Sequence, residues 1–125
     1  MKNLFQQLTE TPMFKKNELS GGTEIFIPTG LVYSDQTSID FDLIRRNETN
    51  ILTDNGRTLS YLDKVFELTE PDVIKNIRAV TEHNGINMTK QRMAVEIVTV
   101  DDYIEKYPKM IFTANFMDRM KMFYV

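Results

Sequence analysis

The residues of this chain that are best suited to chemistry are acidic. Asp40 and Asp42 alternate with apolar residues in one stretch of strand character, Glu24 lies in an earlier stretch, and Asp54 follows a third. Carboxylates that gather on one side of a small sheet can hold a magnesium ion, because hard cations prefer oxygen ligands. One hypothesis is therefore a metal-dependent nuclease or phosphodiesterase that uses Asp40, Asp42 and Asp54.

The surrounding sequence favours a structural role for these carboxylates. A nuclease of this kind needs a lysine beside its carboxylates, and residues 37–44 contain none. Alternating acidic residues on an antiparallel strand are typical of a solvent-facing side. Asp54 belongs to the string Thr53-Asp54-Asn55-Gly56, in which short polar side chains bond to nearby amides and glycine adopts a positive φ. We therefore predict no catalytic residue, no resident metal and no cofactor.

Other catalytic templates find little support. The chain has no cysteine and one histidine, His83, which excludes thiolate chemistry and a histidine-rich metal site within one chain. We expect His83 to lie in the last turn of a helix, where a cationic imidazole is favourable. Neither a nucleophile elbow nor a glycine-rich phosphate loop occurs in the sequence, so acyl transfer and nucleotide binding are not indicated.

The overall charge argues against a dedicated nucleic-acid-binding protein. The formal net charge is −3, whereas such proteins usually present a basic face. A local basic cluster of Arg45, Arg46 and Arg57 is predicted to bind an acidic partner protein. With Lys64 added, the same cluster supports a second alternative, a nucleic-acid-binding regulator. No apolar run approaches the ~20 residues of a membrane span, and we expect a cytoplasmic protein.

The order of elements predicts a single α+β domain, with a small, mostly antiparallel sheet and helices packed on one face. Apolar residues make up 42% of the chain, enough to bury a core. A short strand over residues 23–27 is expected to end at Pro28, and Lys15 and Lys16 are expected in a polar link. The predicted parts are an N-terminal helical lid (1–18), a sheet with two central helices (19–100) and a C-terminal helix (101–125).

The C-terminal stretch carries more apolar side chains than a helix with one buried face requires. It holds four of the eight methionines and three of the eight phenylalanines, and methionine adapts well to irregular contact surfaces. Two interpretations stay open: a central core helix, and a helix that also forms the seam of a homodimer. The predicted self-association residues are Phe116, Met117, Met120 and Phe123.

Three short strings carry a family resemblance. They are residues 25–29 (IFIPT), which end a strand in proline, residues 50–59 (NILTDNGRTL), and residues 84–86 (NGI). The second resembles the signature Leu-Thr-Asp-Asp-Gly-x-Thr-Leu of a bacterial and phage family known as domain of unknown function 1828, and the third resembles its helix-ending Tyr-Gly-Val/Ile. Asn55 replaces the second aspartate of the signature. A metal site built on both aspartates would have lost a ligand here, whereas a turn accepts asparagine.

The resemblance covers roughly residues 19–124 and implies a genomic setting in phages and mobile elements, with no established activity. Small proteins of that setting often block or modulate a host system, an argument from analogy. We therefore predict a non-enzymatic accessory protein of a phage or mobile element. It would bind a host or phage protein stoichiometrically and inhibit or modulate a host defence system.

Overall fold

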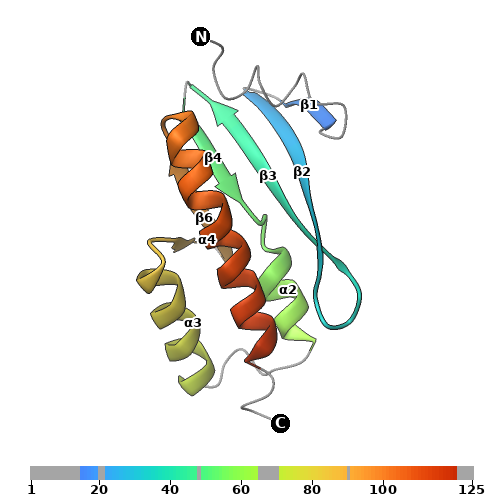
Figure 1. Cartoon of the computed structure of the whole chain (residues 1–125), viewed down its shortest axis with the longest axis vertical. Coiled ribbons are helices and arrows are strands. Elements are labelled where there is room, and N and C mark those ends of the chain that lie inside the picture. Colours follow the sequence, from blue (N-terminus) through green and yellow to red (C-terminus); the bar gives the residue numbers. More distant parts are fainter. Residues whose placement is uncertain (1–14, 20–21, 48, 65–70, 90, 121–125) are drawn as a thin grey trace.

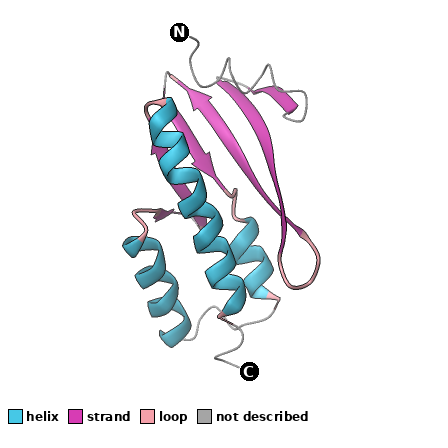
Figure 2. Ribbon diagram, viewed as in Figure 1, coloured by secondary structure: helices cyan, strands magenta, loops and turns pink. Residues whose placement is uncertain are grey.

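The structure is a computed structural model, and it describes residues 15–19, 22–47, 49–64, 71–89 and 91–120. They form the α+β fold that the sequence predicts, with an antiparallel sheet and helices on one of its faces (Figure 1, Figure 2). The strands are β1 (Lys15–Leu19), β2 (Gly22–Val32), β3 (Ser38–Arg46), β4 (Thr49–Thr53), β5 (Asn87–Thr89) and β6 (Arg92–Ile97). The helices are α2 (Arg57–Asp63), α3 (Pro71–His83) and α4 (Val100–Arg119).

The six strands lie in the order β1-β2-β3-β4-β6-β5, and alternation along them separates a core face from an outer face. Phe41 and Leu43 on β3 are buried, and Leu43 lies opposite Ile25 on β2 and Leu52 on β4. One apolar row therefore crosses the sheet beneath the helices. The helices complete the core with the buried side chains of Leu59, Leu62, Val73, Ile77, Met110, Ala114 and Met117.

α4 crosses the covered face of the sheet and begins with a reciprocal cap (Figure 1). The Thr99 side chain accepts a hydrogen bond from the Asp102 backbone N–H at 3.1 Å, and Asp102 Oδ2 accepts one from the Thr99 N–H at 3.2 Å. Two of the open amides at the helix start are satisfied in this way. The helix continues through Pro108 to Arg119. None of the described helices has the length and apolar character that crossing a membrane requires.

Two sequence predictions need correction. β2 does not end at Pro28 but continues to Val32, and its register against β3 shifts between Pro28 and Leu31. Such a bulge accommodates a proline, which cannot donate to the ladder. The predicted helical lid does not extend over residues 15–18, because these residues belong to β1 and pair with β2; residues 1–14 of the predicted lid lie outside the described residues.

Candidate functional site

The chain turns from β4 into α2 at a corner that Asp54 holds from inside. Asp54 is 0% exposed. Its Oδ1 accepts the backbone N–H of Gly56 at 2.9 Å and of Met93 at 3.0 Å, and its Oδ2 accepts that of Thr58 at 3.2 Å. Gly56 has the predicted positive φ, +79°. Both carboxylate oxygens therefore serve the start of α2 and the neighbouring strand β6, which is a backbone-shaping role.

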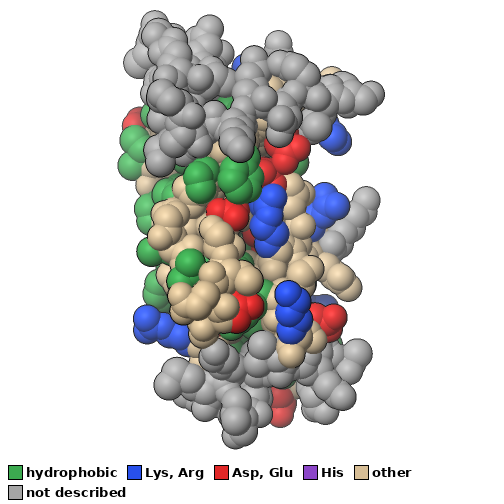
Figure 3. Space-filling model, turned by 90° about the vertical axis from the view of Figure 1, so that its right-hand side faces the viewer, with side chains coloured by type: hydrophobic (Ala, Val, Ile, Leu, Met, Phe, Trp, Pro, Cys, Tyr) green, Lys and Arg blue, Asp and Glu red, His purple; other side chains and the backbone are tan. Residues whose placement is uncertain are grey.

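Asp42 lies on the outer face of the sheet in a polar cluster made of Glu24, Phe26, Asp42, Asn55 and Arg57, hereafter the Asp42 cluster. Its Oδ2 forms an ion pair with Arg57 Nη1 at 2.9 Å and accepts a hydrogen bond from Asn55 Nδ2. The Arg57 guanidinium lies 5.6 Å from the centre of the Phe26 ring, a cation–π contact. Figure 3 shows acidic and basic side chains next to one another on the side of the molecule where β2 lies.

The prediction of a solvent-facing carboxylate is wrong for Asp42, whose side chain is only 1% exposed. The physical reason is the corner: Asn55 lies in it and Arg57 follows it directly, and together they bring an amide and a guanidinium over β3. Removing Arg57 would be costly, because the buried Asp42 carboxylate would lose its charged partner and keep only the hydrogen bond from Asn55.

Glu24 joins the Asp42 cluster through the sheet register. It lies opposite Ile44, and Phe26 lies opposite Asp42, so Glu24 and Asp42 are diagonal neighbours on one face. Burial raises the pKa of Glu24, and the Asp42 carboxylate raises it further through hydrogen bonding and charge, while Arg57 lowers it. While Glu24 is ionised it has no proton to donate, and Asp42 Oδ1 is then buried without a hydrogen-bond partner in the described parts of the chain. A protonated Glu24 can supply the donor that this oxygen lacks.

Replacing Glu24 with glutamine is expected to stabilise the protein at pH 7 by about 0.5–1.5 kcal/mol, because the neutral amide donates permanently and removes a like charge. The folded state raises the pKa of Glu24 above its ordinary 4.5. Protonation therefore favours folding below pH 4.5, and this contribution is lost as pH rises through the folded-state pKa. The advantage of Glu24→Gln should shrink at acidic pH, as measured by urea denaturation across a pH series.

Glu96→Gln is the matched control for this change. Glu96 lies in the same row of the outer face, since Glu24 pairs with Ile44, Ile44 with Ile51, and Ile51 with Glu96. Its side chain is exposed, so its replacement should alter the free energy of unfolding by less than about 0.5 kcal/mol. Two results would contradict a hydrogen bond from protonated Glu24 to Asp42: equal changes in the free energy of unfolding for the two substitutions, or a change for Glu24→Gln that does not depend on pH.

The three aspartates of the nuclease hypothesis are not brought into one site. Asp40 accepts a hydrogen bond from Ser38 Oγ at 2.7 Å, Asp42 faces Arg57, and Asp54 faces backbone amides. Over the described ranges, no group of three or more histidine, cysteine, aspartate or glutamate residues could hold a metal ion. The carboxylates instead stabilise β3 and the corner.

The predicted patch of Arg45, Arg46 and Arg57 does not form one surface. Arg45 and Arg46 are consecutive residues of β3, so they point to opposite faces of the sheet. Arg46 and Arg92 line a hollow of about 320 Å³ on the outer face. Arg57 is held by Asp42. Arg57 and Lys64, which the regulator hypothesis also invokes, line a different hollow of about 260 Å³.

A polar network that the sequence does not signal, buried at its tyrosines and at Asp118, joins the β2–β3 loop to α2 and α4. Asp118 accepts hydrogen bonds from Tyr61 Oη, from Ser34 Oγ at 2.7 Å and from the Ser34 N–H at 3.1 Å. Tyr61 stacks on Tyr33 with ring centres 4.4 Å apart, and Tyr33 Oη bonds to Thr58 Oγ1 at 2.8 Å. Burial raises the pKa of both tyrosines to about 12. Both hydroxyls therefore stay protonated at neutral pH. We call this set the Asp118 network.

An apolar groove of about 550 Å³ lies between α3 and α4, which run antiparallel (Figure 1), and we call it the α3–α4 groove. Phe112 is 56% and Phe116 41% exposed, and their ring centres are 6.3 Å apart. His83 lies in the last turn of α3, as predicted. The residues that line the groove are Asn76, Ala79, Val80 and His83 of α3, Phe112 and Phe116 of α4, and Met120.

The predicted self-association residues divide between the core and this surface. Met117 is buried in the core, and Met120 is buried at the base of the groove. Phe116 is exposed, and Phe123 lies outside the described residues. Phe112 is the exposed ring that the prediction missed, although its spacing of four residues from Phe116 places both on one side of a helix.

Comparisons of the chain with protein-family models, with curated proteins and with solved structures found no match. Membership of the domain of unknown function 1828 family therefore stays a prediction.

Proposed function

We propose that this protein is non-enzymatic and acts by stoichiometric binding of another protein chain through the α3–α4 groove. The observation that carries this proposal is the exposure of Phe112 and Phe116, two neighbouring aromatic rings at the edge of an apolar groove. Neighbouring aromatic side chains that are exposed to solvent at the edge of an apolar groove are typical of a protein-binding surface.

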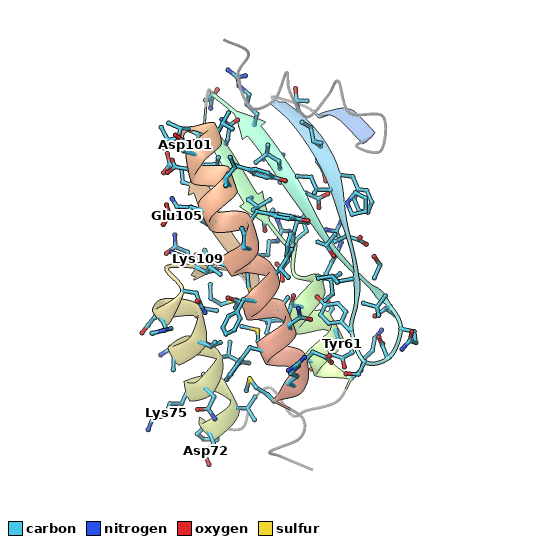
Figure 4. The ribbon with its side chains drawn as sticks, in the orientation of Figure 1. Tyr61, Asp72, Lys75, Asp101, Glu105 and Lys109 are labelled. Atoms are coloured by element: carbon cyan, nitrogen blue, oxygen red, sulfur yellow. The ribbon has the colours of Figure 1, made fainter. Side chains whose placement is uncertain are left out.

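The shape and charge of the groove indicate the chemistry of the partner. A groove between two helices receives a third helix, which inserts apolar side chains at intervals of three or four residues. Charged residues border the two rings along α4. Glu105 and Lys109, ion-paired at 3.3 Å, precede Phe112 and point to the same side of the helix (Figure 4), and Arg119 follows Phe116. The partner element that fits is an amphipathic helix whose apolar stripe is bordered by both signs of charge.

The setting of this activity is proposed from the sequence. The resemblance of residues 50–59 to the 1828 family signature supports an accessory protein of a phage or mobile element. In that setting it would bind a host or phage protein in the bacterial cytoplasm and inhibit or modulate a host defence system. The nuclease alternative is disfavoured because Asp42 and Asp54 are committed to Arg57 and to backbone amides.

The double variant Phe112→Gln/Phe116→Gln tests the proposal. Phe112 is 56% and Phe116 41% exposed, neither belongs to the buried core, and glutamine is a good helix former, so the variant should still fold, with a melting temperature lowered by at most a few degrees. We expect it to lose at least about tenfold in affinity for a protein captured from the host lysate and then purified, since each ring contributes ~1 kcal/mol or more to such a contact. Isothermal titration calorimetry gives both affinity and stoichiometry.

Ile104→Gln is the matched control, because Ile104 is 63% exposed on the same helix but lies roughly 80° around its axis from Phe112. It should bind as the unaltered chain does. Equal binding by all three proteins would overturn the proposed groove. Cleavage of plasmid DNA that depends on magnesium or manganese and disappears in Asp40→Ala/Asp42→Ala would return the nuclease to first place.

A further inference from the structure

The exposed side of α4 carries a charge pattern that fits a second copy of itself. We infer that the protein forms a two-fold symmetric dimer in which the two α4 helices pack antiparallel about Phe112. This inference rests on the proposed function and names the helix that occupies the α3–α4 groove. A helix of a host protein would compete with the second copy for the same surface.

The register follows from the spacing of three residues. Glu105, Phe112 and Arg119 are seven residues apart, close to two helical turns, so they lie almost in a line along α4, and all three are exposed. A two-fold axis at Phe112 places this ring on its copy. Glu105 then lies opposite the partner's Arg119, about 10 Å along the helix from the axis, and the reciprocal pair forms on the other side.

Apolar contacts extend the same register. Residues four positions on either side of Phe112 are Pro108 and Phe116, and both are exposed. The antiparallel arrangement places Phe116 opposite the partner's Pro108. This contact covers the Phe116 ring, which is exposed to solvent in the single chain. Lys109 then lies opposite the partner's Asn115, a contact without like charges.

Other arrangements of the two helices bring like charges together. A parallel pair aligns Glu105, Lys109 and Arg119 each with its own copy. An antiparallel pair with its axis midway between Phe112 and Phe116 places Lys109 opposite the partner's Arg119. Like charges directly opposite each other are unfavourable and suppress such alternatives. The register about Phe112 is the one of these three that pairs opposite charges.

The position of α3 is compatible with this dimer. Figure 1 shows α3 beside the C-terminal half of α4, with no described helix on that side of the N-terminal half. Turning a second copy about the axis brings its α3 beside this free half. Each copy therefore contributes the same surface, and the contact closes at two chains, as an isologous interface requires.

A charge swap on the full chain tests the register. Sedimentation equilibrium should show a dimer whose dissociation constant rises roughly tenfold for Glu105→Arg and for Arg119→Glu, because each change turns two exposed attractive pairs into repulsive ones. The double swap Glu105→Arg/Arg119→Glu should restore the original value. Lys75→Glu is the control: Lys75 is exposed on α3 and points away from α4 (Figure 4), so this change should leave the dissociation constant unaltered.

A dimer that both single swaps leave unchanged, or that the double swap fails to restore, would overturn the register. A monomer at all protein concentrations would overturn the dimer itself. In that case a captured protein that still depends on Phe112 and Phe116 would leave the proposed function standing. The opposite result is also distinguishable. If the charge swaps weaken the dimer but Phe112→Gln/Phe116→Gln does not weaken binding of the captured protein, the dimer stands and the proposed contact with a host protein does not.

Discussion

Asp54→Ala is expected to destabilise the protein by about 4 kcal/mol or more, the largest effect of any single substitution considered, because several buried groups lose their partners together. The change removes the acceptor of three backbone N–H groups, those of Gly56, Thr58 and Met93. Since small domains are stable by only ~5–15 kcal/mol, this loss removes a large share of the free energy of unfolding. Urea denaturation followed by circular dichroism measures the loss.

Two further variants separate the corner from general effects of charge. Asp63→Ala removes an exposed aspartate from the end of the same helix and should change the free energy of unfolding by less than about 0.5 kcal/mol. Asp54→Asn keeps one acceptor oxygen but turns an NH₂ group toward a backbone N–H donor. Its loss of stability should therefore lie between those of Asp63→Ala and Asp54→Ala. If Asp54→Ala proved as stable as the unaltered chain, the corner would not depend on this carboxylate and its chemistry would have to be reconsidered.

Asp118→Ala is expected to cost about 2–4 kcal/mol, because it leaves the buried Tyr61 hydroxyl without its acceptor and removes the part-buried hydrogen bonds from Ser34. These two donors come from α2 and from the β2–β3 loop. The substitution therefore removes a link among three parts of the fold as well as individual hydrogen bonds. Thermal and urea denaturation should show the loss, and hydrogen exchange should increase at Ser34.

A double-mutant cycle with Tyr61→Phe isolates the contact between Tyr61 and Asp118. Tyr61→Phe removes the hydroxyl and preserves the ring that stacks on Tyr33. The double variant should be less destabilised than the sum of the single variants, with a coupling of ~1 kcal/mol or more. Additive effects would show that the two side chains do not support each other.

The corner between β4 and α2 could be predicted from the sequence because the residues that determine it are neighbours in the chain. Asp54 and Gly56 lie within two residues of each other, and their preferences for side-chain-to-amide bonds and positive φ depend on chemistry alone. The alternation in β3 is local in the same sense. This alternation places Phe41 and Leu43 in the core. To predict that, it is enough to assume that one face of the strand is covered.

The hydrogen-bond and ion-pair partners of the polar side chains could not be predicted from the sequence, because they depend on how segments far apart in the chain pack together. Asp118 reaches Ser34 across 84 positions of the chain, and no pattern within a few residues specifies that contact. Asp42 has the sequence surroundings of an exposed carboxylate, yet it is buried since the corner places Asn55 and Arg57 over it.

The C-terminal helix shows the same division within one element. Its composition predicted more apolar surface than one buried stripe needs, and that expectation depends only on which residues are present. Which of them face the core depends on how α4 is rotated on the sheet: Met117 is buried, and Phe112 and Phe116 are left at the groove. The sequence by itself thus determined the fold class, the corner and the apolar surplus, because these follow from neighbouring residues. Only the tertiary structure decided which carboxylates are paired and which rings meet water, because both are set by packing between segments far apart in the chain.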